Sequence, residues 1–481
     1  MRKYLYIIAS VFMLATFNSC SENELDIYPP TSDDIADIDT EEKLQQFLNS
    51  GYLTIASTSS YGTDITAFGD ILSDNMYVLT NKYQFAANLS YNSINNDFGF
   101  YGRLYDIIMS CNMVINNTKV PSSANVERIK AEAKILRGFA YFTLVNFYSP
   151  TPTSGINQEF GVPLVLENYN STIQPARASV TEVFNQIISD LQAGAIGAAD
   201  IGASQNDKVI LTKTAAKLLL SRVYLTRRAS GDAQLALQYA SDIVNSPAAG
   251  FSPIASSGYQ TYFAGNLEAT SENQPETIWE LDITFDTSRL TGIGSNLSLP
   301  GLYHRTDGGR SFMFTRDFYN SFSNTDVRRG NGANALLTTT GGTPTGVWTN
   351  KYPRLTESGL YLRNIKVLRF AEAQLNRIEA LNLTGQTATA LTELNAFATS
   401  RGGSAYSGTN LLNDILTERS KEFYAEGYRF HDLKRYSLPL VKNTNCTMNC
   451  NVPANDKLFV IPVSRTALSQ NVNLTQYPGY N

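Results

Sequence analysis

Apolar residues recur at steps of three and four along much of the chain, which is the pattern of amphipathic helices. Residues 126–148 show it most clearly, and Pro150 and Pro152 follow where such a helix must end. The same period predicts further helices at 41–55, 101–117, 180–194, 212–228, 232–246, 364–383, 386–400 and 411–427. The pattern therefore predicts a mostly α-helical protein.

Several of the predicted helices follow one another as pairs. The pair at 212–246 has small residues such as Ala236 and Ala240 where helices would cross, and large ones such as Leu219 and Tyr224 between them. Segment 364–400 repeats this arrangement loosely. Small residues at crossings, with a large one per turn, are typical of tetratricopeptide-type helix hairpins. We therefore expect helical hairpins stacked along the chain.

The helical period is lost between residues 248 and 360, where Gly, Ser, Thr, Asn and aromatic residues dominate. Residues 278–283 alternate like a short strand, and the remainder predicts loop. A long irregular region inside a compact protein usually carries function. We expect a helical scaffold that supports a loop-rich binding face.

The N-terminus has the features of a secretory signal peptide, predicted at 1–19. Arg2 and Lys3 precede an apolar segment, Tyr4 to Phe17, and small residues lead to Cys20. The apolar segment is shorter than the about 20 residues that span a bilayer. A buried core helix is the alternative, and the polar, acidic sequence that follows argues against it.

Cys20 lies where a bacterial lipoprotein carries its acylated cysteine. Residues 17–20 (FNSC) resemble a loose lipobox, so we expect a lipid anchor at Cys20 and a tether over 20–40. The alternative is ordinary signal-peptide cleavage, with Cys20 a bystander. Residues 21–26 (SENELD) resemble the surface-export signal of Bacteroidetes lipoproteins, which implies an outer-membrane protein that faces the cell exterior.

The charge balance excludes some partners. The chain has 38 basic and 43 acidic residues, a net charge of −5, and losing Arg2 and Lys3 with the signal peptide makes it more negative. Nucleic acids and anionic lipid surfaces both require basic patches, so neither is an expected partner. Four cysteines are too few for a disulfide scaffold.

The other cysteines suggest one local disulfide. Cys446 and Cys450 frame Thr-Met-Asn within a Pro/Asn-rich loop, and outside the cytoplasm we expect them to be bonded to each other. A zinc site is disfavoured because the chain has only two histidines and no second cysteine pair. Cys111 lies in an apolar helical pattern and is expected to be a buried thiol. No metal site or cofactor is predicted, and structural calcium is left open.

Four segments together resemble the SusD/RagB family of surface nutrient-binding lipoproteins. They are 131–142 (AEAKILRGFAYF), 367–380 (VLRFAEAQLNRIEA), 418–435 (ERSKEFYAEGYRFHDLKR), and Ile461-Pro462 with 473–480 (NLTQYPGY). Their order and spacing extend the resemblance over the whole chain. It departs at Phe100-Tyr101, where the family often has tryptophan, and at Tyr477, where it often has asparagine.

The resemblance implies a single SusD-like domain over 41–481. Its fold would have about eight helices in four tetratricopeptide-like pairs and a loop-rich, short-strand ligand face, with an irregular insertion at about 248–360. The resemblance also implies a partner, a SusC-like TonB-dependent outer-membrane channel. Family members bind mostly oligosaccharides and in some cases peptides, and catalysis is not a family activity.

Glu418, Glu422 and Glu426 are spaced four apart on predicted helix 411–427, and a carboxylate pair could hydrolyse glycosides. Cations such as Arg419 are interleaved with them. Helical ion pairs of this kind contribute a few tenths of a kcal/mol each when exposed, and nearby cations lower the pKa that a catalytic acid needs raised. We interpret the motif as a structural ion-pair network. No Gly-x-Ser-x-Gly elbow, Walker loop or dinucleotide fingerprint occurs, so no enzyme activity is expected.

Aromatic residues in polar loops are the candidate ligand contacts. An exposed ring can cover the apolar face of a sugar while neighbouring polar groups bind its hydroxyls. The candidates are Tyr83, Tyr91, Asn92, Phe98, Tyr303, Arg310, Trp348 and Tyr352. The alternative for each ring is burial against its own loop. Trp279, in the strand-like segment, is expected in the core, and the scarcity of tryptophan keeps a peptide ligand open as the alternative to a glycan.

Overall fold

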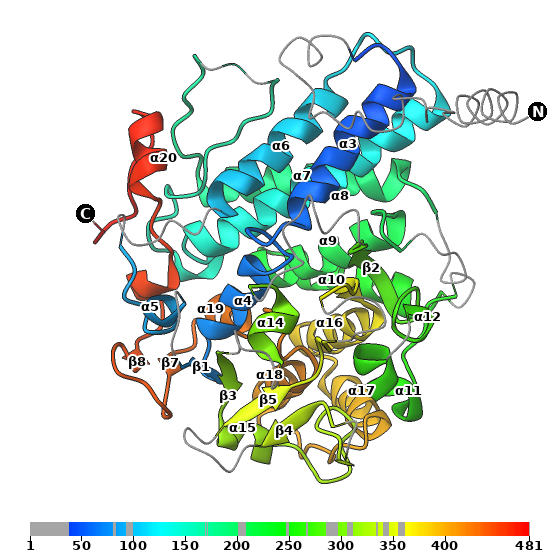
Figure 1. Cartoon of the computed structure of the whole chain (residues 1–481), viewed down its shortest axis with the longest axis vertical. Coiled ribbons are helices and arrows are strands. Elements are labelled where there is room, and N and C mark those ends of the chain that lie inside the picture. Colours follow the sequence, from blue (N-terminus) through cyan, green and yellow to red (C-terminus); the bar gives the residue numbers. More distant parts are fainter. Residues whose placement is uncertain are drawn as a thin grey trace, which may run out of the picture.

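The computed structural model describes residues 38–480 except for 80–82, 93–99, 169, 171, 201–207, 247–249, 266–267, 285–296, 305–310, 333–334, 340–345 and 355–360. The chain is mostly helical (Figure 1). The predicted signal peptide and Cys20 lie outside the described residues. None of the helices in the described ranges is both long and apolar enough to cross a lipid bilayer.

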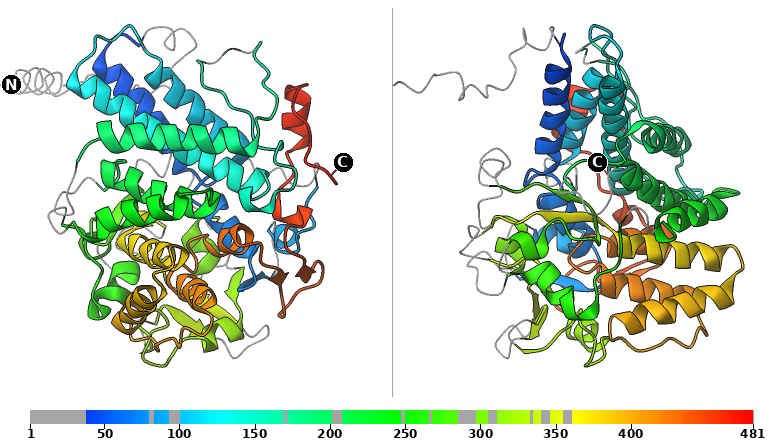
Figure 2. Two further views of the ribbon diagram at one scale, coloured as in Figure 1. Left: turned by 180° about the vertical axis from the view of Figure 1, so that it is seen from behind. Right: turned by 90° about the vertical axis from the view of Figure 1, so that its right-hand side faces the viewer.

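Within the described part, eight long helices are stacked in chain order, and each packs against the next (Figures 1 and 2). They are α3 (Glu41–Ile55), α6 (Phe100–Ile115), α7 (Ala124–Tyr148), α8 (Val180–Gly197), α9 (Lys213–Arg227), α10 (Asp232–Val244), α16 (Phe370–Leu383) and α17 (Thr387–Ser400). A further helix, α18 (Leu411–Glu422), packs against α16 and α17. The predicted mostly α-helical fold is confirmed.

Two predicted helices have different bounds. Segment 364–383 begins as strand β6 (Ile365–Arg369) and becomes helical only at Phe370. Segment 411–427 leaves the helix after Glu422, and Ala425 and Gly427 then take left-handed φ angles of 61° and 81°. A Cβ on Gly427 would lie 2.9 Å from the Thr66 carbonyl oxygen, so this turn requires a glycine.

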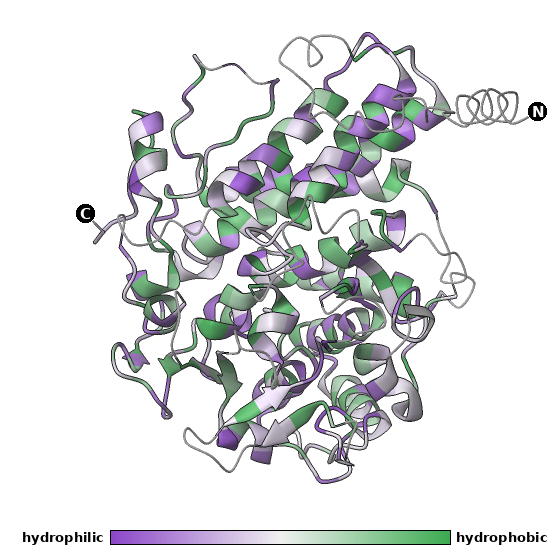
Figure 3. Cartoon of the chain, in the orientation of Figure 1, coloured by the Kyte–Doolittle hydropathy of each residue, from purple (hydrophilic) through white to green (hydrophobic). Residues whose placement is uncertain are grey.

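Local signals explain where the helices begin. Ser179 caps α8 through a reciprocal capping box with Glu182, and Ser123 caps α7 by accepting from the Val126 amide. Hydrophilic and hydrophobic residues alternate along α3 and α6, as expected for helices with one buried face (Figure 3). Helix α7 is buried along most of its length, between α6 and α8.

The region predicted as irregular contains regular structure. Strands β3 (Phe312–Phe314), β4 (Leu337–Thr339) and β5 (Val347–Thr349) join β1 (Met76–Val78) in an antiparallel sheet of order β1-β3-β5-β4. Strands of three residues are too short for an alternating pattern to be recognised. The predicted strand at 278–283 is found as β2 (Thr277–Leu281), which pairs with β6.

The remaining elements are short and were not predicted. Among the described residues, short α-helices are found at α4 (Asp64–Ile71), α5 (Gln84–Ala87), α11 (Ser256–Ala264), α12 (Glu268–Ser271), α14 (Leu299–Tyr303), α15 (Arg316–Asn320) and α19 (Arg429–Arg435). Helix α20 (Arg465–Gln470) and the hairpin of β7 (Leu440–Val441) and β8 (Asn451–Val452) lie near the C-terminus. In the lower half of the right-hand view of Figure 2, the sheet and α14 lie on one side of the molecule and α16–α18 on the other.

Candidate ligand face and the charged core beneath it

Most of the predicted ligand aromatics are buried. Tyr83 and Tyr303 are 0 % exposed, Tyr91 is 4 % exposed and Trp348 is 5 % exposed. The expectation that these four rings offer an exposed face is therefore wrong. Their polar sequence neighbourhoods indicated loops, but Tyr303 lies in α14 and Trp348 lies in β5, and all four rings are buried. Ligand contact at these positions stays an untested prediction.

Tyr83 and Tyr303 fasten the ligand-face segments to α4. The Tyr83 hydroxyl donates to Asp64 at 2.6 Å, and the Tyr303 hydroxyl donates to Asp70 at 2.8 Å. Both rings pack edge-on against Phe312, with centroids 5.2 and 5.1 Å away. Burial raises the pKa of Asp70 to about 8, although the hydrogen bond from Tyr303 acts in the opposite direction. These tyrosines are structural links.

Trp348 and Tyr91 have comparable structural roles. Trp348 lies in β5 opposite Thr338, and its ring packs with Tyr77 and Met313 in a small buried cluster. The Tyr91 hydroxyl donates to the Leu458 carbonyl. Trp279 is fully buried, as predicted.

The other candidates differ in position. Tyr352 is partly exposed and Asn92 is exposed, whereas Phe98 and Arg310 lie outside the described residues. The Tyr352 hydroxyl donates to the Ala425 carbonyl at 2.7 Å. Among the predicted aromatic candidates that the structure describes, only Tyr352 has a partly exposed side chain.

Tyr352 lines a shallow recess together with Tyr361, Arg363 and Lys366. Tyr361 is also partly exposed, and the Arg354 guanidinium lies 5.6 Å from its ring centroid. The recess has a volume of about 20 Å³, enough for about one water molecule, whereas small-molecule sites usually occupy about 300–1,000 Å³. The recess formed by the described residues is therefore too small to hold a sugar ring.

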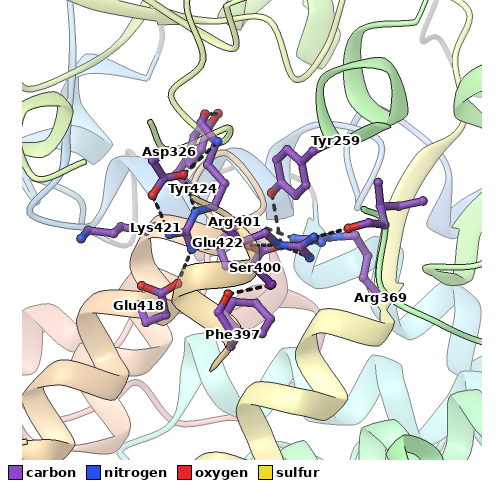
Figure 4. Close-up of polar contacts among 12 residues, drawn as sticks. Tyr259, Asp326, Arg369, Phe397, Ser400, Arg401, Glu418, Lys421, Glu422 and Tyr424 are labelled. Atoms are coloured by element: carbon purple, nitrogen blue, oxygen red, sulfur yellow. Dashed lines mark hydrogen bonds and ion pairs between the residues drawn. The ribbon is translucent and has the colours of Figure 1, made fainter. Parts of the chain in front are cut away.

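A network of buried charges adjoins the Tyr352 recess, which Lys351 and Glu426 also line. Figure 4 shows the part of the network around Glu422. Arg369 donates to Glu422 at 2.9 Å and to Glu426 at 2.8 Å. Arg401 donates to Glu422 at 3.3 Å, and both arginines also contact Glu276. The predicted ion-pair network is present, but its arginine partners come from β6 and from the end of α17 instead of neighbouring helix turns. Glu422 and both arginines are 1 % exposed or less.

The network continues on both sides of Glu422. Arg328 pairs with Glu418 at 2.5 Å and with Asp326 at 2.7 Å. Lys351 donates to Glu426 at 2.7 Å, and burial lowers the pKa of its amine to about 8. A buried pair of this kind loses desolvation energy on folding, but removing one partner leaves an uncompensated charge and is strongly destabilising. The network therefore fixes how the distant segments fit together.

Glu422 is poorly suited to donate a proton. Burial alone would raise its pKa, but Arg401 and Arg369 outweigh that effect and hold the pKa below its ordinary value. A catalytic acid needs the opposite shift. The described residues contain no group of three or more His, Cys, Asp or Glu side chains arranged to hold a metal ion.

Cys446, Cys450 and Cys111 lie as expected, whereas Cys20 is outside the described residues. Cys446 and Cys450 form a disulfide with Cα atoms 5.7 Å apart, and Cys111 is a fully buried thiol. Sequence reasoning missed Glu276, Asp326 and Arg328 as network members. Glu276 lies 93 residues from its partner Arg369, and Arg328 lies 90 residues from its partner Glu418. Asp326 joins the network through Arg328, which follows two positions later. The spacing of residues within 367–380 and 418–435 therefore could not identify these members.

Two family models match the chain. One, described as "Starch-binding associating with outer membrane", matches residues 24–225, and the other, described as "SusD family", matches residues 331–480. A SusD-like protein from Bacteroides ovatus is 28 % identical over 258 residues, which are 50 % of this chain and 44 % of that protein. This alignment therefore spans less than half of the relative.

Solved structures share the fold over nearly the whole chain. A putative sugar-binding protein from Bacteroides vulgatus is 24 % identical, with a TM-score of 0.82 over 92 % of this chain and 99 % of that one. Surface glycan-binding protein A from Bacteroides fluxus is 21 % identical, with a TM-score of 0.72 over 92 % and 99 %. At these identities the likeness establishes the fold alone. Because the two family models together match more than half of the sequence, the chain is a member of the SusD/RagB family.

Proposed function

We propose that this protein binds an oligosaccharide or polysaccharide at the cell surface and delivers it to a SusC-like TonB-dependent outer-membrane channel. The observation that carries the proposal is the family membership, together with a fold shared over 92 % of the chain with proteins described as sugar-binding and glycan-binding. The family description that mentions the outer membrane supports the location.

The remaining parts of the proposal concern the whole chain. Residues 1–19 act as a lipoprotein signal peptide, Cys20 carries the lipid, 20–40 form the tether and 41–481 fold as one domain. The protein acts by binding, without catalysis. The buried, cation-paired state of Glu422 supports this, because it leaves the helix motif without an acid of raised pKa.

The test is an affinity-electrophoresis screen of residues 21–481 against plant, host and microbial polysaccharides, with bovine albumin as the non-binding reference. We expect retarded migration in at least one polysaccharide. Migration unchanged in every polysaccharide, together with binding to a protein digest measured by calorimetry, would replace the glycan with a peptide ligand.

The delivery step has its own test. A SusC-like TonB-dependent channel should copurify with the lipidated protein from detergent-solubilised outer membranes, and less of it should copurify with a Cys20→Ala variant, which lacks the lipid. Failure of a channel to copurify with the lipidated protein would contradict the partner assignment and leave glycan binding intact.

A further inference from the structure

A larger cavity than the Tyr352 recess lies between α15, α18 and the β7–β8 hairpin, in the lower part of Figure 1. Its volume is about 290 Å³, close to the lower end of the usual range for small-molecule sites. The Tyr352 recess has different lining residues, so the two are separate. We refer to the larger cavity as the α15–α18 cleft.

Part of the cleft wall is held rigidly by polar contacts between distant segments. Arg429 donates to the two carboxylate oxygens of Asp74 at 2.8 and 2.7 Å, and each side chain is 20 % exposed. Nearby, the Asn75 amide donates to the Ser420 hydroxyl at 2.6 Å. Bidentate pairs are geometrically specific, so this wall is preorganised and nearly charge-neutral.

Other polar groups lining the cleft remain available to a ligand. The side chains of Asp317, Thr417, Asn443 and Thr444 make no hydrogen bond with the described residues. Lys421 adds a cation, and Phe318, which is 6 % exposed, contributes an apolar surface. The cleft therefore offers donors and acceptors, with two carboxylates balanced by two cations.

The hairpin side of the cleft is anchored at both ends. The Lys442 amine donates to the Ile71 and Ala87 carbonyls at 2.8 and 2.6 Å, and the Asn449 amide donates to the Asn88 and Leu89 carbonyls at 3.0 Å each. The Cys446–Cys450 disulfide closes the intervening loop. Asn443 and Thr444 are thus held between fixed points, which reduces the entropy that a ligand would lose by ordering them.

We propose that the α15–α18 cleft binds an uncharged segment of the captured glycan. Balanced charges give no net attraction to a polyanion or a polycation, whereas interspersed hydroxyl, amide and carboxylate groups match the hydroxyls of a neutral sugar. The assignment rests on the proposed function and adds to it a position and a ligand class.

The test uses Thr417→Trp to fill the cleft and Thr392→Trp, on an exposed face of α17, as the matched control. The probes are soluble starch, arabinoxylan, galactomannan and yeast mannan, titrated by calorimetry. For a glycan bound by the parent, we expect Thr417→Trp to raise Kd at least about tenfold and Thr392→Trp to leave it unchanged. Circular dichroism establishes folding, and Asn443→Ala serves if Thr417→Trp is misfolded, with an expected loss of about 2–10-fold for one hydrogen bond.

The outcomes separate this proposal from the proposed function. Glycan binding that is equally strong in the parent, in Thr417→Trp and in Asn443→Ala would overturn the cleft assignment and leave glycan capture standing. No binding to any glycan by the parent would overturn both. Binding of a peptide digest that is blocked by Thr417→Trp would overturn the ligand class assigned to the cleft.

Discussion

Arg369 Nη1 donates to Glu422 Oε1 at 2.9 Å, although the two residues are 53 positions apart and come from β6 and α18. The same guanidinium contacts Glu276, which precedes β2, and Glu426, which follows α18. The Arg369 side chain therefore links the β2–β6 strand pair to the segment 418–435. The contact explains why these motifs are charged and yet buried.

Replacing Arg369 with Ala should lower the free energy of unfolding by about 3–5 kcal/mol, because buried carboxylates would lose their main counter-charge. Arg103→Ala is the control, since Arg103 pairs with Asp106 on the surface at 3.3 Å and an exposed pair contributes less than about 1 kcal/mol. Urea unfolding of both variants measures the difference. Equal losses in the two variants would contradict the assigned role of the network.

The titration of Asp432 should lower the free energy of unfolding as the pH falls into the acid range. Burial would raise its pKa, but Arg419 and Arg435 lower it to about 2, below the value of about 3.9 in the unfolded chain. The unfolded state therefore takes up the proton first as the pH falls. The stabilisation is present above about pH 4 and is lost as the pH falls toward 2, by about 2 kcal/mol.

Asp432→Asn provides the measurement of that pH dependence. At pH 7 the variant should be less stable than the parent, because Arg419 and Arg435 lose a charged partner. The difference in the free energy of unfolding between parent and variant should narrow between pH 4 and pH 2, where Asp432 of the parent becomes neutral as well. If urea unfolding gives the same difference in free energy of unfolding at every pH from 7 to 2.5, Asp432 does not titrate as described.

The Cys446–Cys450 disulfide should stabilise the hairpin by restricting the unfolded chain. For so short a loop the expected contribution is about 2 kcal/mol. Melting of residues 21–481 with and without reductant measures it in the parent, and a Cys446→Ser/Cys450→Ser variant should be insensitive to reductant. An equal effect of reductant on parent and variant would place the reducible bond elsewhere.

Trp348→Ala should destabilise the protein by about 3–5 kcal/mol, because the ring is 5 % exposed and packs with Tyr77 and Met313. Tyr361→Ala, at a partly exposed ring, should cost less. Denaturant melts of the two variants compare them directly. Because Trp348→Ala is expected to destabilise the fold, loss of ligand binding in this variant would not show that the ring contacts a sugar. A Trp348→Ala variant as stable as the parent would contradict the stabilising role of the buried ring.

The sequence predicted the long helices because their apolar residues repeat over many turns, as in 126–148. It also predicted the disulfide, because Cys446 and Cys450 are close in sequence. It failed where the decisive contacts join distant segments. The sequence around Tyr83 and Tyr303 does not indicate that their hydroxyls donate hydrogen bonds to Asp64 and Asp70. The sequence around Glu422 likewise does not indicate that Arg401 is its partner. One wall of the α15–α18 cleft likewise depends on the hydrogen bonds between Asp74 and Arg429, which are 355 positions apart.

Calorimetric titration of residues 21–481 with purified oligosaccharides tests most directly whether the protein captures a glycan. The oligosaccharides should come from whichever polysaccharide retards the protein in the electrophoretic screen. We expect saturable binding of these oligosaccharides and no binding of unrelated oligosaccharides of the same length. Absence of heat with every oligosaccharide, alongside saturable binding of a peptide, would contradict the glycan assignment.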